Sequence, residues 1–83
     1  MVWRVVITNK LKEYREQKMR LASNSSDWTQ ETIALRVGVT RQTIISIEKG
    51  TYNPSLELAF RLASLLNVRI DDLFQFEGDE IEY

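Results

Sequence analysis

The 83-residue chain contains no cysteine and no histidine. Without cysteine, neither a disulfide framework nor a thiolate metal site can form, and a reducing compartment such as the cytoplasm is the expected location. Without histidine, the side chain that most often serves as a general base near neutral pH is missing. The remaining carboxylate pairs, Asp71 with Asp72 and Glu80 with Glu82, are typical of a helix start and a charged tail. We therefore expect no enzyme, no cofactor and no metal site.

The chain also lacks a long apolar run and a glycine-rich phosphate loop. The apolar stretch within residues 1–8 is too short to span a membrane and has no small-residue cleavage site, so neither a membrane segment nor a targeting segment is expected. Apolar residues make up 43% of the sequence and charged residues 28%. This composition predicts one folded domain over residues 1–83, too small for a large enclosed ligand site. No small-molecule ligand is expected.

The net charge of −1 conceals an uneven distribution. Residues 1–69 carry all 11 Lys and Arg residues and six of the 12 acidic residues, whereas residues 70–83 carry the other six acids and no base. A basic face in the first part of the chain remains compatible with phosphate binding, because charges within a Debye length of roughly 8 Å matter more than the total. The acidic end is expected to be a solubilising segment on the side opposite the third helix; the alternative is a tail that competes with DNA for the basic face.

Local signals predict a strand followed by a helical core. Residues 2–8, VWRVVIT, are β-branched and aromatic and predict a short strand. Residues 9–74 form the expected core, and its first helix, capped by Asn9 or Thr8, runs to about Met19 or Leu21. Residues 23–27, SNSSD, favour a loop because their side chains bond their own backbone.

Three threonine or serine caps place the next helices. Thr29 caps the second helix, which ends at Gly38, and Thr40 caps the third, which ends at Gly50. Ser55 caps a strongly apolar fourth helix. A short fifth helix over residues 70–74 and a strand over residues 74–77 follow, and residues 75–83 form an acidic strand or tail. We predict an all-α, compact five-helix domain with a small two-stranded antiparallel sheet made by the N- and C-terminal segments.

The informative stretch is residues 29–50, two short helices joined only by Gly38, Val39 and Thr40. Such a tight joint crosses the helices steeply, so their apolar residues share one small core and the third helix keeps an outward face. Arg41 and Gln42 lie in its first turn, where a helix that enters the major groove comes nearest the bases. Arginine can donate two hydrogen bonds to guanine, glutamine can pair with adenine, and a threonine methyl group can contact thymine.

The sequence resembles the lambda-repressor and Cro-like helix-turn-helix family, also called the xenobiotic-response-element type, over roughly residues 11–74. The resemblance rests on Leu11 and Arg15, TQE followed by Ala34, the Gly38-Val39 turn, RQTI, IEKG, and YNPSLELAFRLASLL ending in DDLF. It implies that Arg41 and Gln42 read bases and that Ser46 contacts a base or the backbone. It also implies that Gln30 braces the motif and reaches a phosphate, and that Lys49 and Asn53 hold phosphates. The complete set of candidate DNA-binding residues is Gln30, Thr40, Arg41, Gln42, Thr43, Ser46, Lys49, Tyr52 and Asn53.

The resemblance also implies an ion pair between Arg15 and Glu48 with a structural role. The sequence departs from the family pattern in an insertion of about eight residues, Met19–Ser26, which could lengthen the first helix or form a loop near the DNA backbone. Trp28, which follows it, is expected to pack beside the second helix.

The predicted function is that of a sequence-specific double-stranded DNA-binding transcriptional regulator, a repressor that reads an operator as a homodimer. A two-stranded sheet is marginal alone, so a second subunit is expected to cover its residues Trp3, Val5, Phe74 and Phe76. The alternative is a protein-interaction module of the same fold, such as an antitoxin-like regulator. Loss of DNA affinity on replacing Arg41 and Gln42 would discriminate between them.

Overall fold

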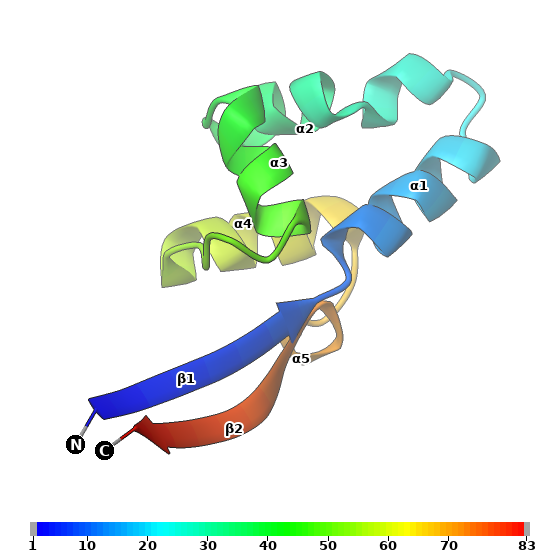
Figure 1. Cartoon of the computed structure of the whole chain (residues 1–83). Coiled ribbons are helices and arrows are strands. Elements are labelled where there is room, and N and C mark those ends of the chain that lie inside the picture. Colours follow the sequence, from blue (N-terminus) through cyan, green and yellow to red (C-terminus); the bar gives the residue numbers. More distant parts are fainter. Residues whose placement is uncertain (1, 83) are drawn as a thin grey trace.

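The computed structural model describes residues 2–82, and it describes side chains for residues 6–78. In this range five α-helices form a helical body, and the two ends of the chain pair in a two-stranded antiparallel sheet that projects from it (Figure 1). This sheet is called the hairpin below, although no turn joins its two strands. The predicted fold class is therefore confirmed. In chain order the elements are β1 (Val2–Asn9), α1 (Leu11–Leu21), a 3-10 helix η1 (Ser25–Trp28), α2 (Gln30–Val37), α3 (Arg41–Glu48), α4 (Leu56–Leu66), α5 (Ile70–Leu73) and β2 (Phe74–Glu82).

The starts of α2, α3 and α4 follow the predicted caps. The side-chain oxygens of Thr29, Thr40 and Ser55 each accept a hydrogen bond from the backbone N–H three residues later. Such a bond satisfies one of the N–H groups that a helix start leaves without a partner. Gly38 ends α2 with a φ of +78°, the left-handed conformation that favours glycine. These local bonds determine where α2, α3 and α4 begin. The predicted cap of α1 by Asn9 or Thr8 is wrong, because both residues still belong to β1 and the capping position is taken by Lys10, which makes no side-chain cap bond.

α4 lies at the centre of the body and packs against α2 and α5. Leu62 and Leu66 on this helix are fully buried, as predicted from its apolar composition. Burying a leucine side chain contributes about 1.5–3 kcal/mol, so this helix anchors the domain. The remaining fully buried large side chains come from α1, α2, α3 and α5: Leu11, Ile33, Ile44, Ile47 and Leu73.

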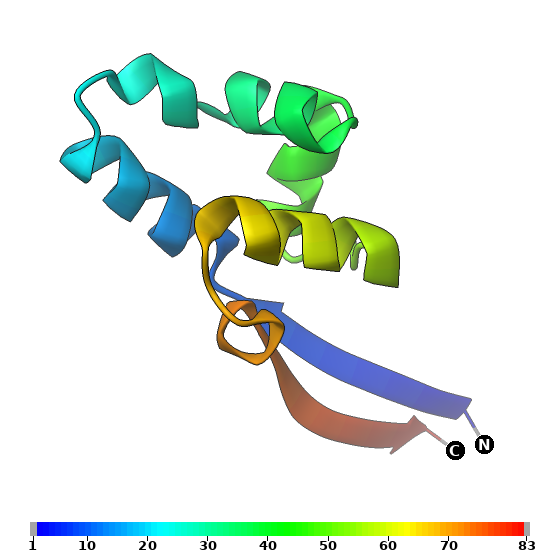
Figure 2. The same cartoon turned by 180° about the vertical axis from the view of Figure 1, so that it is seen from behind.

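The hairpin is longer than the sequence indicated. β2 continues to Glu82 instead of ending near residue 77, because it pairs with β1 along its whole length, with one irregularity beside Val6 and Ile7. Figures 1 and 2 show the strands extending away from the helices, and the longest dimension of the molecule is 51 Å. The side chains of Trp3 and Val5, for which a cover was predicted, lie outside the described residues.

The inserted segment is partly helical. α1 continues into it as far as Leu21, and η1 forms part of the predicted loop, with Asn24 accepting from the Ser26 N–H. Trp28 is half-buried against the core, as expected, and its ring lies between Lys18 of α1 and Arg36 of α2, at 5.8 and 5.6 Å from the ring centroid. Trp28, just after the insertion, thus links α1 to α2 by packing and cation–π contacts.

None of the helices in residues 2–82 has the length and apolar character needed to cross a bilayer.

Candidate nucleic-acid interface

α3 is held against the body by its apolar side. Ile44 and Ile47 are fully buried, and Val39 in the preceding turn packs against the same core, as predicted. Thr40 Oγ1 accepts from the backbone N–H of Thr43 at 3.3 Å. The helix therefore has one fixed side and one side that faces away from the core.

The outward side of α3 carries the residues that were predicted to read bases. Arg41 and Gln42 are both exposed in the first turn. Gln42 Nε2 donates to Ser46 Oγ at 3.4 Å, which directs its amide along the helix. One shallow hollow on this side is lined by predicted site residues alone: Thr40, Gln42, Thr43, Ser46 and Tyr52. The structure thus gathers these residues on one surface.

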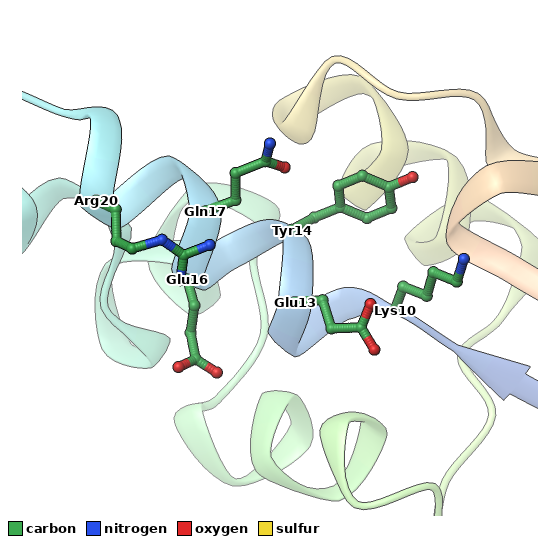
Figure 3. Close-up of a pocket in the computed structure, with 6 residues that line it drawn as sticks. All are labelled: Lys10, Glu13, Tyr14, Glu16, Gln17 and Arg20. Carbon is green, nitrogen blue, oxygen red and sulfur yellow. The ribbon is translucent and has the colours of Figure 1, made fainter.

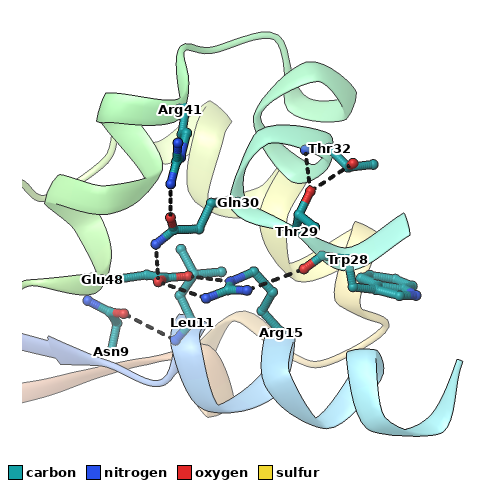
Figure 4. Close-up of polar contacts among 9 residues, drawn as sticks. All are labelled: Asn9, Leu11, Arg15, Trp28, Thr29, Gln30, Thr32, Arg41 and Glu48. Carbon is teal, nitrogen blue, oxygen red and sulfur yellow. Dashed lines mark hydrogen bonds and ion pairs between the residues drawn. The ribbon is translucent and has the colours of Figure 1, made fainter. Parts of the chain in front are cut away.

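Gln30, the first residue of α2, connects α2 to α3. Its Nε2 donates to Glu48 Oε1 at 3.0 Å, and its Oε1 accepts from Arg41 Nη2 at 3.5 Å (Figure 4). Together these bonds orient the amide, with nitrogen towards Glu48 and oxygen towards Arg41. The second bond is at the long limit, so it holds the guanidinium only weakly. Gln30 therefore braces the motif, and its contact with a phosphate stays a prediction.

The ion pair below Gln30 has the predicted partners. Arg15 Nε lies 2.7 Å from Glu48 Oε2, and Arg15 Nη2 donates to Glu48 Oε1 at 3.2 Å. The two side chains are only 9% and 5% exposed. Arg15 Nη1 also donates to the carbonyl of Trp28 at 3.4 Å. This charged pair links α1, α3 and the end of η1, which is a structural role.

Neither of the two predicted phosphate ligands after α3 lines the shallow hollow. Lys49 caps the end of α3 and is exposed. Asn53 is also exposed, but it lines a different groove, together with Ile7 of β1 and Leu56 of α4. Asn53 directly follows Tyr52, which lines the shallow hollow, but Asn53 itself lines the groove beside β1 and α4.

The acidic end of the chain lies away from the first turn of α3. In Figures 1 and 2, α4 lies between α2 on one side and α5 with the hairpin on the other. Asp71 and Asp72 occupy the first turn of α5, as predicted. The amino-terminal end of α3 therefore faces away from these acids, whereas its carboxyl-terminal end approaches the base of the hairpin.

Another hollow lies on the outer face of α1 (Figure 3). Its lining mixes bases, acids, an amide and a phenol: Lys10, Glu13, Tyr14, Glu16, Gln17 and Arg20. Because two bases and two acids line it together, the hollow has no field of one sign that would attract a charged ligand. Among the described residues, no three carboxylate side chains gather where they could hold a metal ion.

Comparisons with known proteins agree with this geometry. A family profile described as "Helix-turn-helix" matches residues 11–73. An uncharacterized HTH-type transcriptional regulator of Methanocaldococcus jannaschii is 50% identical over 72 residues, which is 87% of this chain and 97% of that protein. The uncharacterized HTH-type transcriptional regulator YgzD of Bacillus subtilis is 39% identical over 71 residues, which is 86% of this chain and 96% of that protein.

A more distant relative carries a more specific name. The cryptic phage CTXphi transcriptional repressor RstR of Vibrio cholerae is 38% identical over 56 residues, 68% of this chain and 50% of that protein. The family match covers most of the helical body, including the capped helices α2 and α3 and the tight turn between them. The chain belongs to the lambda-repressor-like, or xenobiotic-response-element type, family of helix-turn-helix transcriptional regulators.

Proposed function

We propose that this protein binds double-stranded DNA sequence-specifically and reads the major groove with the first turn of α3. The observation that carries the proposal is the exposure of Arg41 and Gln42 at the start of a helix whose opposite side is fixed by Ile44 and Ile47. A helix presented in this way can enter the groove end-on without any rearrangement of the core.

Each exposed side chain has a partner in the groove. Arg41 donates two hydrogen bonds to guanine O6 and N7, and Gln42 pairs with the amino group and N7 of adenine. On binding, Arg41 gives up only its long bond to Gln30 and gains its bonds to the base. The free-energy cost of this exchange is therefore small. Thr43 offers a methyl group to thymine. The surrounding donors contact phosphates and keep the helix in register: Gln30, Thr40, Ser46, Lys49, Tyr52 and Asn53.

The protein binds its operator as a homodimer. A hairpin of two strands is marginally stable alone, and β1 and β2 project from the helical body, so a second copy stabilises them by covering their apolar residues. Two-fold symmetry then places two copies of α3 about 34 Å apart on a near-palindromic site. Occupation of such a site blocks transcription, the activity for which the relative RstR is named a repressor.

The test is selection of bound duplexes from a random pool, followed by affinity measurement on the selected duplex. The double replacement Arg41→Ala with Gln42→Ala is expected to lower affinity about 30-fold or more, because each bidentate pair contributes about 1–3 kcal/mol. Affinity for random DNA should change far less.

The matched control is Arg20→Ala with Gln17→Ala, which removes the same residue types from the exposed outer face of α1. This control should bind the selected duplex as the wild type does. If the Arg41 and Gln42 replacements left affinity for every duplex unchanged, the proposal would fail. The protein would then be a protein-interaction module of this fold, and a co-purifying partner would identify it.

A further inference from the structure

Asn9 joins the hairpin to two helices through one side chain. It is the last residue of β1, where it pairs with Phe74 of β2. Its Oδ1 accepts from the backbone N–H of Leu11 at 3.1 Å, at the start of α1 (Figure 4). Its Nδ2 donates to the carbonyl of Ile47 at 2.9 Å, in the last turn of α3. The half-buried amide therefore lies where β1, α1 and α3 meet.

Asn9 uses both halves of its amide at this junction. Its nitrogen gives the Ile47 carbonyl a second donor, beside the backbone N–H of Gly50 at 2.9 Å. Its oxygen supplies an acceptor to one of the first N–H groups of α1, which lack partners within the helix. Asparagine supplies both from one short side chain, whereas aspartate supplies only the acceptor. Next to this junction, the backbone N–H of Lys10 donates to the carbonyl of Leu73 at 2.9 Å, which ties the hairpin base to α5.

We propose that Asn9 is a positioning residue that sets the angle between the hairpin and α3, and thereby the spacing between the two half-sites that a dimer reads. This inference rests on the homodimer proposed above, in which the hairpin carries the contact between subunits. The eight residues of β1 span about 26 Å at a rise of about 3.3 Å per residue. A rotation of about 10° at the base moves the tip by about 4–5 Å, more than the 3.4 Å rise of one base pair.

The first test needs no DNA. Because the chain has no cysteine, two introduced cysteines, Gln42→Cys on α3 and Glu77→Cys on β2, can carry spin labels without background. Double electron–electron resonance then measures the distance between hairpin and helix within one subunit, with unlabelled protein added in excess. The labelled parent chain is expected to give one narrow distance distribution.

Asn9→Asp retains the acceptor for Leu11 and loses the donor to Ile47, so the distribution should broaden or shift. Asn9→Ala should change the distribution in the same way. If the alanine variant does not fold, the distribution of Asn9→Asp alone tests the proposal. The matched control is Asn24→Ala. This replacement removes an asparagine cap from η1, an element that does not take part in the junction of β1, α1 and α3. An unchanged distribution in Asn9→Asp would overturn the proposal.

The second test uses duplexes with the selected half-sites at the preferred spacing and with one base pair added or removed. The wild type should prefer one spacing. In Asn9→Asp that preference should fall about fivefold or more, the equivalent of one lost hydrogen bond, while affinity for a single half-site stays within about twofold. Retention of the full preference would contradict the role in spacing. A wild type without any spacing preference would instead refute the homodimer, and the label distances would still decide the role of Asn9 in orienting α3.

Discussion

The pair formed by Arg15 and Glu48 allows a quantitative prediction. Replacing Glu48 with alanine leaves the Arg15 guanidinium in a site where its side chain is only 9% exposed, and it removes the acceptor of the Gln30 bond. Breaking a shielded pair of this kind costs about 3–5 kcal/mol, because the remaining charge has lost both water and its partner. Since 1 kcal/mol shifts the Tm of a domain of this size by about 4–8 °C, the Tm should fall by at least about 12 °C.

The free energy of unfolding is measured by urea unfolding with linear extrapolation, and the Tm by thermal unfolding, both followed by circular dichroism. The pair Glu57 and Arg61 provides the matched control. It is also an Arg–Glu ion pair, but its side chains are 74% and 55% exposed, so Glu57→Ala should cost less than about 0.5 kcal/mol.

A single replacement both removes the attraction between the two charges and leaves one charge buried without a partner. The double variant Arg15→Met with Glu48→Leu removes the attraction but leaves no charge behind, so it separates the two effects. Because both charges leave together and apolar groups of similar size replace them, it should be considerably more stable than either Arg15→Ala or Glu48→Ala. The reasoning would be refuted if Glu48→Ala cost no more than Glu57→Ala, or if the double variant lost the sum of the two single losses.

Three further predictions test local features. Gly38→Ala should lower the free energy of unfolding by about 1–2 kcal/mol in urea titrations, because φ is +78° and a Cβ would meet only Arg61 Nη1 at 3.6 Å; an equal stability would contradict the assigned backbone strain. Ser55→Ala should cost about 1 kcal/mol in the same assay through loss of the α4 cap, without weakening DNA binding. Lys49→Ala should reduce the slope of log affinity against log salt by about 1 in fluorescence anisotropy titrations, and an unchanged slope would remove Lys49 from the set of phosphate contacts.

Helix boundaries could be predicted from the sequence because their causes lie within a few residues of one another. Thr29, Thr40 and Ser55 each cap a helix by bonding a backbone N–H three residues later, and a hydroxyl before an apolar period is visible in the sequence. The exposed side of α3 could be predicted for the same reason, since the burial of Ile44 and Ile47 leaves Arg41 and Gln42 on the other side.

Pairings between distant residues could not be derived in the same way. The length of β2 depends on pairing with a strand at the other end of the chain, and its tail has no strong strand pattern of its own. The bond between Asn9 and Ile47 joins residues 38 positions apart, and nothing near Asn9 in the sequence indicates it. Only the family resemblance implied the contact of Arg15 with Glu48.

The sequence by itself determined the caps, the tight turn and the outward placement of Arg41 and Gln42, because short-range hydrogen bonds and helical periodicity act over a few residues. Only the tertiary structure decided that Gln30 turns its amide nitrogen towards Glu48 and that Asn9 ties the hairpin to α3. A polar side chain can satisfy its hydrogen bonds with many partners, and the packing of distant elements selects among them.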